Sequence, residues 1–153
     1  MIPPSRTPIK TVITFDDLYS KAAPTGPLPS DYLGFTWCEN AWFLTKGYYS
    51  AVHTGHRVVL FNAHGGDISF DREQAFDLTG LSLSPIWEDV ATVFVEGWKK
   101  GSGTYSREVA IYRNAVARQE LNFRGVDRVS LSTGGVHIMV EDISVLLGRG
   151  ATP

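Results

Sequence analysis

The sequence of 153 residues contains almost no cysteine, since Cys38 is the only one. A single cysteine excludes an intrachain disulfide and any metal site built from several cysteines. A catalytic thiolate would need a base beside it, and no spacing in the chain places a histidine next to Cys38. We therefore expect Cys38 to be a small apolar residue of the interior.

Long apolar runs are also missing. No stretch reaches the length that a membrane-spanning helix requires. The first ten residues, MIPPSRTPIK, contain three prolines and lack the apolar segment of a signal peptide. The chain as written is therefore expected to be soluble and without membrane association, and to be cytosolic unless a leader has been removed.

Charged residues are scarce as well, at 20% of the chain, and the formal net charge is −2. This balance argues against nucleic-acid binding, which requires a basic surface. Hydrophobic residues, at 43%, can fill the core of one domain, and 153 residues are too few to expect two. We expect one domain over residues 11–148, with an extended arm at 1–10 and a tail at 149–153.

The clearest strand pattern covers residues 90–98, where side chains alternate with a period of two and both faces are partly apolar, as in a strand inside a sandwich. One face carries Val90, Thr92, Phe94, Glu96 and Trp98, and the other carries Ala91, Val93, Val95 and Gly97. A glycine-containing turn at 99–103 leads into a second strand at 104–111. The two segments are therefore predicted to form a hairpin.

Further short strands are expected along the chain, without helical patterns between them. They cover 11–15, 32–45 with a break at 39–40, 56–62, 67–70, 76–84, 115–123, 127–132 and 136–147. A proline-rich loop is expected at 20–31, an irregular segment at 47–55, and 72–77 is the one place for a helical turn. The predicted fold class is all-β, an antiparallel jelly-roll β-sandwich.

Several segments appear in an order shared with a known group of domains. They are ITFDDL (13–18), DYLGFTW (31–37), GYYSAV (47–52), VVLFNAHGGDIS (58–69), FDLTGLSLSPIW (76–87), VFVEGW (93–98), FRGVDRVSLSTGG (123–135) and IMVEDISV (138–145). This order resembles jelly-roll β-sandwich domains that look like carbohydrate-binding modules of secreted microbial and fungal proteins. The resemblance implies a noncatalytic, lectin-like module with a structural calcium between its first and last strands. The implied ligands are Asp16 or Asp17 and Glu141 or Asp142.

The last strand supplies a physical argument for the same metal. Glu141 shares one face of this strand with apolar residues, so its carboxylate would point inward if that face is the core. A buried carboxylate is costly unless it is paired or bound to a metal. Asp16 and Asp17 could add oxygen ligands, which calcium prefers. The alternatives are that Glu141 pairs with an arginine or a backbone amide, or that the opposite face is the core.

Aromatic residues gather in the loop-rich stretch 37–49 and recur at residue 87. Exposed rings can stack on a sugar while polar neighbours bind its hydroxyl groups. The candidate carbohydrate-binding residues are Trp37, Glu39, Asn40, Trp42, Tyr48, Tyr49, Asn62, His64, Asp67 and Trp87. For each tryptophan, the alternative is a place in the core.

Histidines and carboxylates leave other functions open. His53, His56 and His64 contain donors for zinc or copper, but their spacing forms no motif, so we expect them to be solvated. The chain has no nucleophile elbow, zinc-protease helix, phosphate loop or dinucleotide fingerprint. The alternatives to a carbohydrate-binding module are a small enzyme with His or carboxylate groups in a cleft, and an assembly protein. In the latter, exposed rings would join copies into a homo-oligomer.

Overall fold

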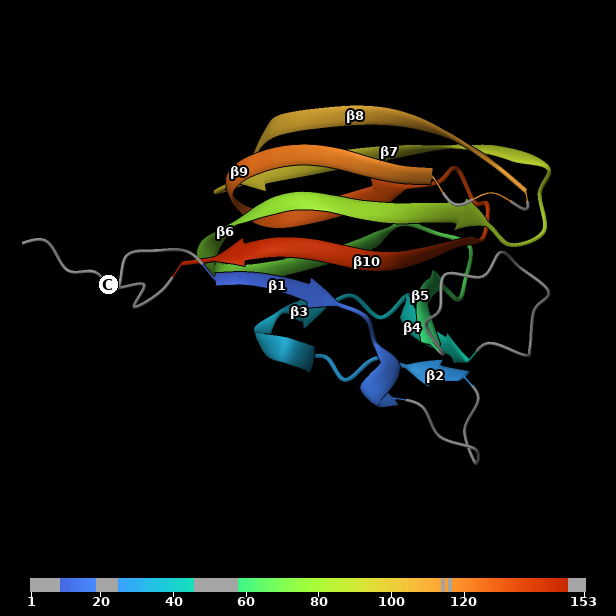
Figure 1. The fold of residues 1–153 in the computed structure, drawn as a ribbon, viewed down its shortest axis with the longest axis horizontal. Helices are drawn as coiled ribbons and strands as arrows, with labels where there is room; N and C mark the ends of the chain where they lie inside the picture. The colour runs from blue at the N-terminus through green and yellow to red at the C-terminus, as the bar shows by residue number, and fades with distance from the viewer. Residues whose placement is uncertain (1–8, 19–24, 46–57, 114, 116, 149–153) are drawn as a thin grey trace, which may run out of the picture.

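The protein is an all-β sandwich, described in a computed structural model over residues 9–18, 25–45, 58–113, 115 and 117–148 (Figure 1). This confirms the predicted fold class. The strands of the described residues are β1 (Ile9–Ile13), β2 (Thr25–Pro27), β3 (Thr36–Trp37), β4 (Ala41–Thr45), β5 (Val58–Asn62), β6 (Ile68–Pro85), β7 (Val90–Lys99), β8 (Ser102–Tyr112), β9 (Ala117–Ser132) and β10 (Ile138–Leu147). Two short 3-10 turns, η2 (Asp16–Leu18) and η3 (Tyr32–Gly34), accompany them.

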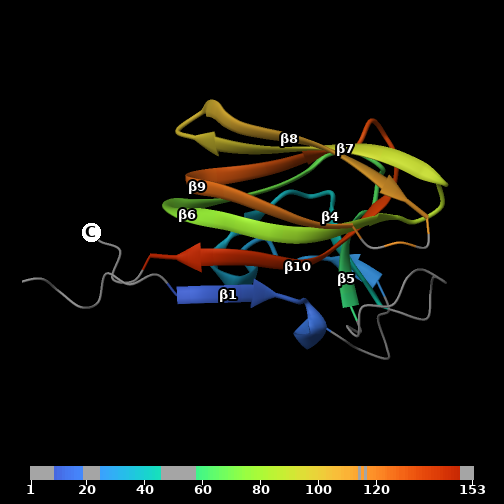
Figure 2. The same ribbon diagram turned by 45° about the horizontal axis from the view of Figure 1, so that its top comes forward.

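The strands pair antiparallel in the order β2-β4-β5-β10-β6-β9-β7-β8, with β1 beside β10 and β3 beside β6. Figure 2 shows the succession β8, β7, β9, β6, β10 and β1 from one side of the molecule to the other. The long strands β6 and β9 pair along most of their length, and register shifts interrupt this ladder between Asp71 and Gly80. Such irregularities let a strand bend and increase its local twist.

The core confirms the alternation predicted for β7. Ala91, Val93 and Val95 are buried on the inner face, whereas Thr92 and Phe94 on the outer face are exposed. The hairpin is confirmed too, because β7 pairs with β8 along its length. This assigns one face of the β7–β8 hairpin to the interior and leaves the other open to ligands or partners.

Several predicted boundaries were wrong. The segments 67–70 and 76–84 belong to one strand, β6, which also includes the 72–77 stretch where a helical turn was considered. Likewise 115–123 and 127–132 are mostly joined in β9. The expected loop at 20–31 contains β2, a three-residue edge strand that ends in proline. Proline is tolerated there because an edge strand does not need every backbone N–H.

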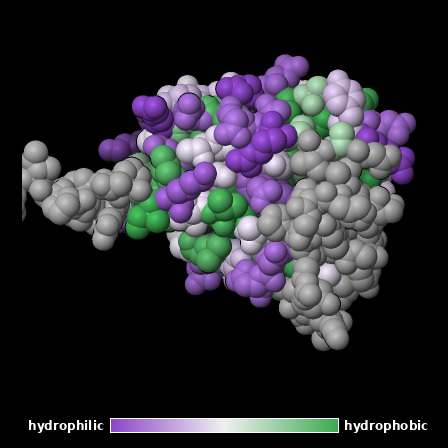
Figure 3. Space-filling model, in the orientation of Figure 1, coloured by the Kyte–Doolittle hydropathy of each residue, from purple (hydrophilic) through white to green (hydrophobic). Residues whose placement is uncertain are grey.

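The surface of the described residues is mixed in polarity. Figure 3 shows hydrophobic side chains in small separate patches among hydrophilic ones. The most exposed large apolar side chain in the described part of the chain is Trp87, at 61%. Within the same residues, no helix has the length and hydropathy that crossing a membrane would require.

Candidate functional site

Two residues predicted to contact carbohydrate lie in the interior. Trp37 is only 4% exposed and stacks on Phe70 with ring centroids 4.9 Å apart, while its indole N–H donates to the Tyr32 carbonyl at 2.8 Å. Asn62 is fully buried. Neither side chain can reach a ligand at the surface, so the expectation that they bind sugar directly was wrong. The reason is that Trp37 points to the inner face of the sheet, where its ring packs in the aromatic core.

The Asn62 side chain instead joins two turns at one end of the sandwich. Its Nδ2 donates to the Gly66 carbonyl at 2.9 Å and to the Val136 carbonyl at 2.8 Å. Its Oδ1 accepts a hydrogen bond from the Ile138 backbone N–H at 2.7 Å. These bonds tie the β5–β6 turn to the β9–β10 turn. Both turns are therefore held by one buried amide.

Asn40 connects the next loop to the same end. Its Nδ2 donates to the Asp67 carbonyl at 3.0 Å, and its Oδ1 accepts from the His64 backbone N–H at 2.7 Å. The Ile86 N–H donates to the His137 carbonyl at 3.1 Å, which attaches the loop after β6. Four connecting segments are thus cross-linked by hydrogen bonds. The backbone positions of these segments are therefore held relative to one another.

The side chains on these segments form a surface that we call the loop end. It consists of Glu39, Asn40, Trp42, His64, Asp67, Trp87 and His137. The Trp87 ring packs edge-to-face on His137 with centroids 4.8 Å apart, and Trp42 packs in the same manner on His64 at 5.8 Å. The structure therefore brings six of the predicted ligand-binding residues to one end of the molecule. Tyr48, Tyr49, His53 and His56 lie outside the described residues.

His137 was missed by the sequence reasoning. It follows the Gly134–Gly135 turn and precedes β10, a position that exposes side chains. One of its ring nitrogens, Nε2, lies 3.3 Å from the Ala63 carbonyl oxygen. This contact orients the imidazole against which the Trp87 ring packs edge-to-face.

The predicted metal ligands lie just beyond the paired residues of β1 and β10, because this pairing ends at Ile13 and Ile143. Ile13 is opposite Ile143, and Glu141 is buried at 3% exposure, as expected for an inward carboxylate. Asp16 Oδ1 accepts a hydrogen bond from the Val58 backbone N–H at 3.1 Å. Among the described residues, no group of three or more histidine, cysteine or acidic side chains is arranged to hold a metal ion. A calcium ion there would have to take much of its coordination from carbonyl oxygens or water.

Asp17 has a protein partner of its own. It accepts a hydrogen bond from the Tyr32 hydroxyl. Burial, together with this hydrogen bond and the negative charge of Asp17, raises the pKa of Tyr32 above its ordinary value. The contact fixes η2 against η3, which is a structural role that does not require a metal.

A second candidate surface lies on the outer face of the sheet. A groove of about 530 Å³, which we call the charged groove, is lined by Thr36, Asp71, Arg72, Glu73, Trp98, Lys100, Gly101, Asp127 and Arg128. Its central row crosses four strands, because Thr36 is opposite Asp71, Asp71 is opposite Arg128, and Arg128 is opposite Trp98. Opposed residues of an antiparallel pair share a face, so the four side chains stand side by side.

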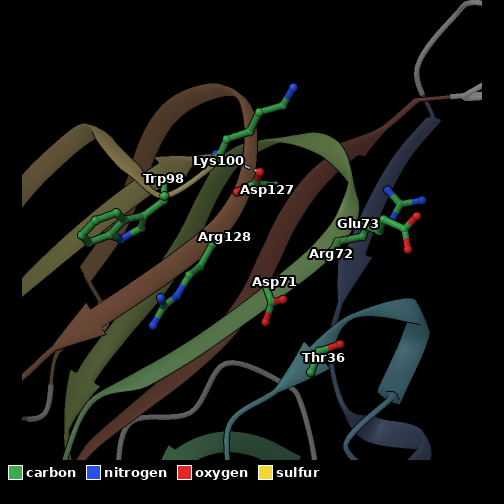
Figure 4. Close-up of a pocket in the computed structure, with 9 residues that line it drawn as sticks. Thr36, Asp71, Arg72, Glu73, Trp98, Lys100, Asp127 and Arg128 are labelled. Carbon is green, nitrogen blue, oxygen red and sulfur yellow. Dashed lines mark hydrogen bonds between the residues drawn. The ribbon is translucent and has the colours of Figure 1, made fainter.

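Figure 4 shows Arg128 between Trp98 and Asp71. The Arg128 guanidinium lies over the Trp98 ring, 5.8 Å from its centroid, and the indole N–H donates to Ser130 Oγ at 3.1 Å. At one end of the groove, the Lys100 backbone N–H donates to Asp127 Oδ2 at 2.9 Å. Trp98 was not among the predicted site residues. Its alternation with Glu96 and Thr92 on the polar face of β7 was the available signal.

Comparisons with known proteins bear on the fold. The structure is similar to an arabinose-bound α-L-arabinofuranosidase, with a TM-score of 0.54 and 10% identity, over 78% of this chain and only 24% of that one. It is also similar to the cleaved adhesin domain of Lys-gingipain from Porphyromonas gingivalis, with a TM-score of 0.54 and 9% identity, over 92% of this chain and 99% of that domain. A family 29 carbohydrate-binding module from Piromyces equi gives a TM-score of 0.48 and 15% identity, with 95% of each chain covered.

The similarities to the arabinofuranosidase and to the adhesin domain confirm the expected β-sandwich fold. At such low identity they concern the fold and not the ligand. No protein-family model matches the chain, and no curated protein matches its sequence.

Proposed function

We propose that the protein is a noncatalytic carbohydrate-binding module that holds its ligand at the loop end. The observation that carries this proposal is Trp87, whose indole is 61% exposed and yet supported by His137. An exposed aromatic ring that a neighbouring side chain holds in place can stack on the apolar face of a sugar. Trp42 and the polar groups of Glu39 and Asp67 lie on the same loop end, so stacking and hydrogen bonding are available together.

Rigidity of the loop end favours ligand binding over a purely structural role for these rings. The amides of Asn40 and Asn62 fix the supporting turns before any ligand arrives. A pre-formed site loses little conformational entropy on binding. Weak stacking contacts then suffice for measurable affinity for a sugar chain.

The test is a glycan array, followed by affinity electrophoresis in gels that contain the polysaccharides found to bind. Trp87→Ala should weaken binding by roughly tenfold, which corresponds to about 1.4 kcal/mol. Leu33→Ala is the matched control, since Leu33 is 52% exposed but lies on η3, away from the loop end. Unchanged binding by Trp87→Ala, or a fully negative array, would refute the proposal.

The same rings could instead join two copies of the chain, which would make the protein an assembly module. Light scattering across a concentration series distinguishes the two functions. A dimer that Trp87→Ala converts to monomer, together with a negative array, would favour assembly. Release of reducing sugar from a bound polysaccharide would favour the enzyme alternative.

We also propose a structural calcium between β1 and β10, with Asp16 or Asp17 and Glu141 or Asp142 as side-chain ligands. Support comes from the pairing of Ile13 with Ile143, which brings the end of β1, next to Asp16 and Asp17, alongside β10. Calcium bound to the folded state would raise the thermal midpoint as its concentration increases. Magnesium is the control ion. A midpoint of thermal unfolding that does not change with calcium concentration would exclude the site.

A further inference from the structure

We infer that the charged groove is a second carbohydrate site, separate from the loop end, and that it takes a neutral sugar unit. This inference deepens the proposed function and rests on it for the class of ligand. The groove is on the outer face of the sheet, whereas the loop end is built from connecting segments. The two surfaces are also separated along β9. Arg128 lies four residues, or roughly 13 Å of extended strand, before Ser132, where β9 ends and the turn that leads to His137 begins.

Asp71 and Arg128 are the groups expected to contact the sugar. Both are exposed and stand directly opposite each other on β6 and β9, yet they form no ion pair. Among the described residues, neither carboxylate nor guanidinium makes a hydrogen bond to another side chain or to the backbone. A carboxylate that accepts beside a guanidinium that donates matches two neighbouring hydroxyl groups, each of which both donates and accepts.

Trp98 acts as a positioning residue in this arrangement. Its indole is anchored by the bond to Ser130, and its ring lies beneath the Arg128 guanidinium. The cation–π contact restricts the long arginine side chain before the ligand arrives. Thr36, opposite Asp71 on β3, adds a hydroxyl on the far side of the row.

The charge of the groove selects a neutral ligand. Three acidic residues (Asp71, Glu73 and Asp127) and three basic ones (Arg72, Lys100 and Arg128) line it. Opposite charges in equal number leave the groove without a net positive charge to attract an anion. An acidic sugar brought to Arg128 would also meet the carboxylate of Asp71. Neutral sugars avoid this repulsion and still use both groups.

The test follows the indole N–H resonances of the four tryptophans in isotope-labelled full-length protein. Neutral oligosaccharides of glucose, mannose, xylose and galactose are titrated, with oligogalacturonate as the acidic comparison. We expect the Trp98 resonance to shift with a neutral oligosaccharide, and to do so equally in Trp87→Ala. Asp71→Asn and Arg128→Lys should each raise the concentration at half-saturation at least tenfold. The first replaces the charged acceptor by a neutral amide, and the second replaces the planar guanidinium that lies over Trp98 by an ammonium group.

Glu108→Gln is the matched control, since Glu108 is an exposed carboxylate on β8 outside the groove. Thermal melting of each variant establishes that it is folded. If Asp71→Asn does not fold, Arg128→Lys still tests the inference, because it retains the positive charge. A Trp98 resonance that no neutral oligosaccharide shifts overturns the inference, as does one that only oligogalacturonate shifts. If only the proposed binding at the loop end is wrong, the oligosaccharide shifts the indole N–H resonance of Trp98 and leaves that of Trp87 unchanged.

Discussion

Replacement of Asn62 by alanine is expected to loosen the whole loop end and to destabilise the protein strongly. The substitution removes three short hydrogen bonds, at 2.9, 2.8 and 2.7 Å, to Gly66, Val136 and Ile138. Each such bond contributes about 1 kcal/mol net, and a buried partner left without one costs about 1–3 kcal/mol. The free energy of unfolding should therefore fall by about 3–5 kcal/mol.

Urea unfolding followed by tryptophan fluorescence measures this change. The midpoint should fall while the slope with denaturant stays constant, because the native surface is otherwise preserved. In thermal melting, each kcal/mol corresponds to roughly 2–4 °C for a chain of this size, so the midpoint should fall by at least about 6 °C. The variant should also lose carbohydrate binding at the loop end before it unfolds.

Asn40→Ala is the graded control for this prediction. Asn40 makes two comparable hydrogen bonds, to Asp67 and His64, but it is only partly buried. Water can replace those bonds, so the expected loss is about 1–2 kcal/mol. If Asn62→Ala costs less than 1 kcal/mol, or no more than Asn40→Ala, the claim that one buried amide holds both turns is refuted.

Three other changes give distinct results. Gly97→Ala should destabilise by about 1–3 kcal/mol in urea, because its Cβ would lie 2.9 Å from Phe123 and 3.0 Å from Val126 in the core; unchanged stability would show that these side chains yield freely. Because the pKa of Tyr32 is raised in the folded state, the unfolded chain releases its proton first and stability should fall above about pH 10. Tyr32→Phe should reduce that fall in alkaline melts. Glu141→Gln should abolish any rise of the thermal midpoint with calcium, and a rise that persists would place the ion elsewhere.

Alternation predicts well those strands that have one face buried in the core and the other exposed to solvent, such as β7. Residues 90–98 predicted the strand β7 because the side chains alternate with a period of two, and one face carries only the small or apolar residues Ala91, Val93, Val95 and Gly97. The same rule could not join 67–70 to 76–84, since Arg72, Glu73 and Gln74 are polar on both faces. Residues 72–75 remain extended because β9 pairs with β6 both before them, at 68–71, and after them, at 76–83. This pairing depends on residues that lie far along the chain.

The candidate sites show the same limit. Trp37 and Trp87 both occur near loops. The pairing of β3 with β6 buries Trp37, whereas Trp87 lies in the connection after β6 and is exposed. The charged groove was beyond sequence reasoning for a related reason. Its central residues, Asp71, Trp98 and Arg128, come from three strands, and strand register alone makes them neighbours.

The place of β10 has a consequence for biosynthesis. This strand is the last of the described chain to leave the ribosome, yet it is inserted between β5 and β6 and also pairs with β1. Until it arrives, those three strands present unpaired backbone edges, which are prone to join other nascent chains. A premature stop codon even a few residues before position 138 should therefore yield aggregates and not a shortened but folded domain.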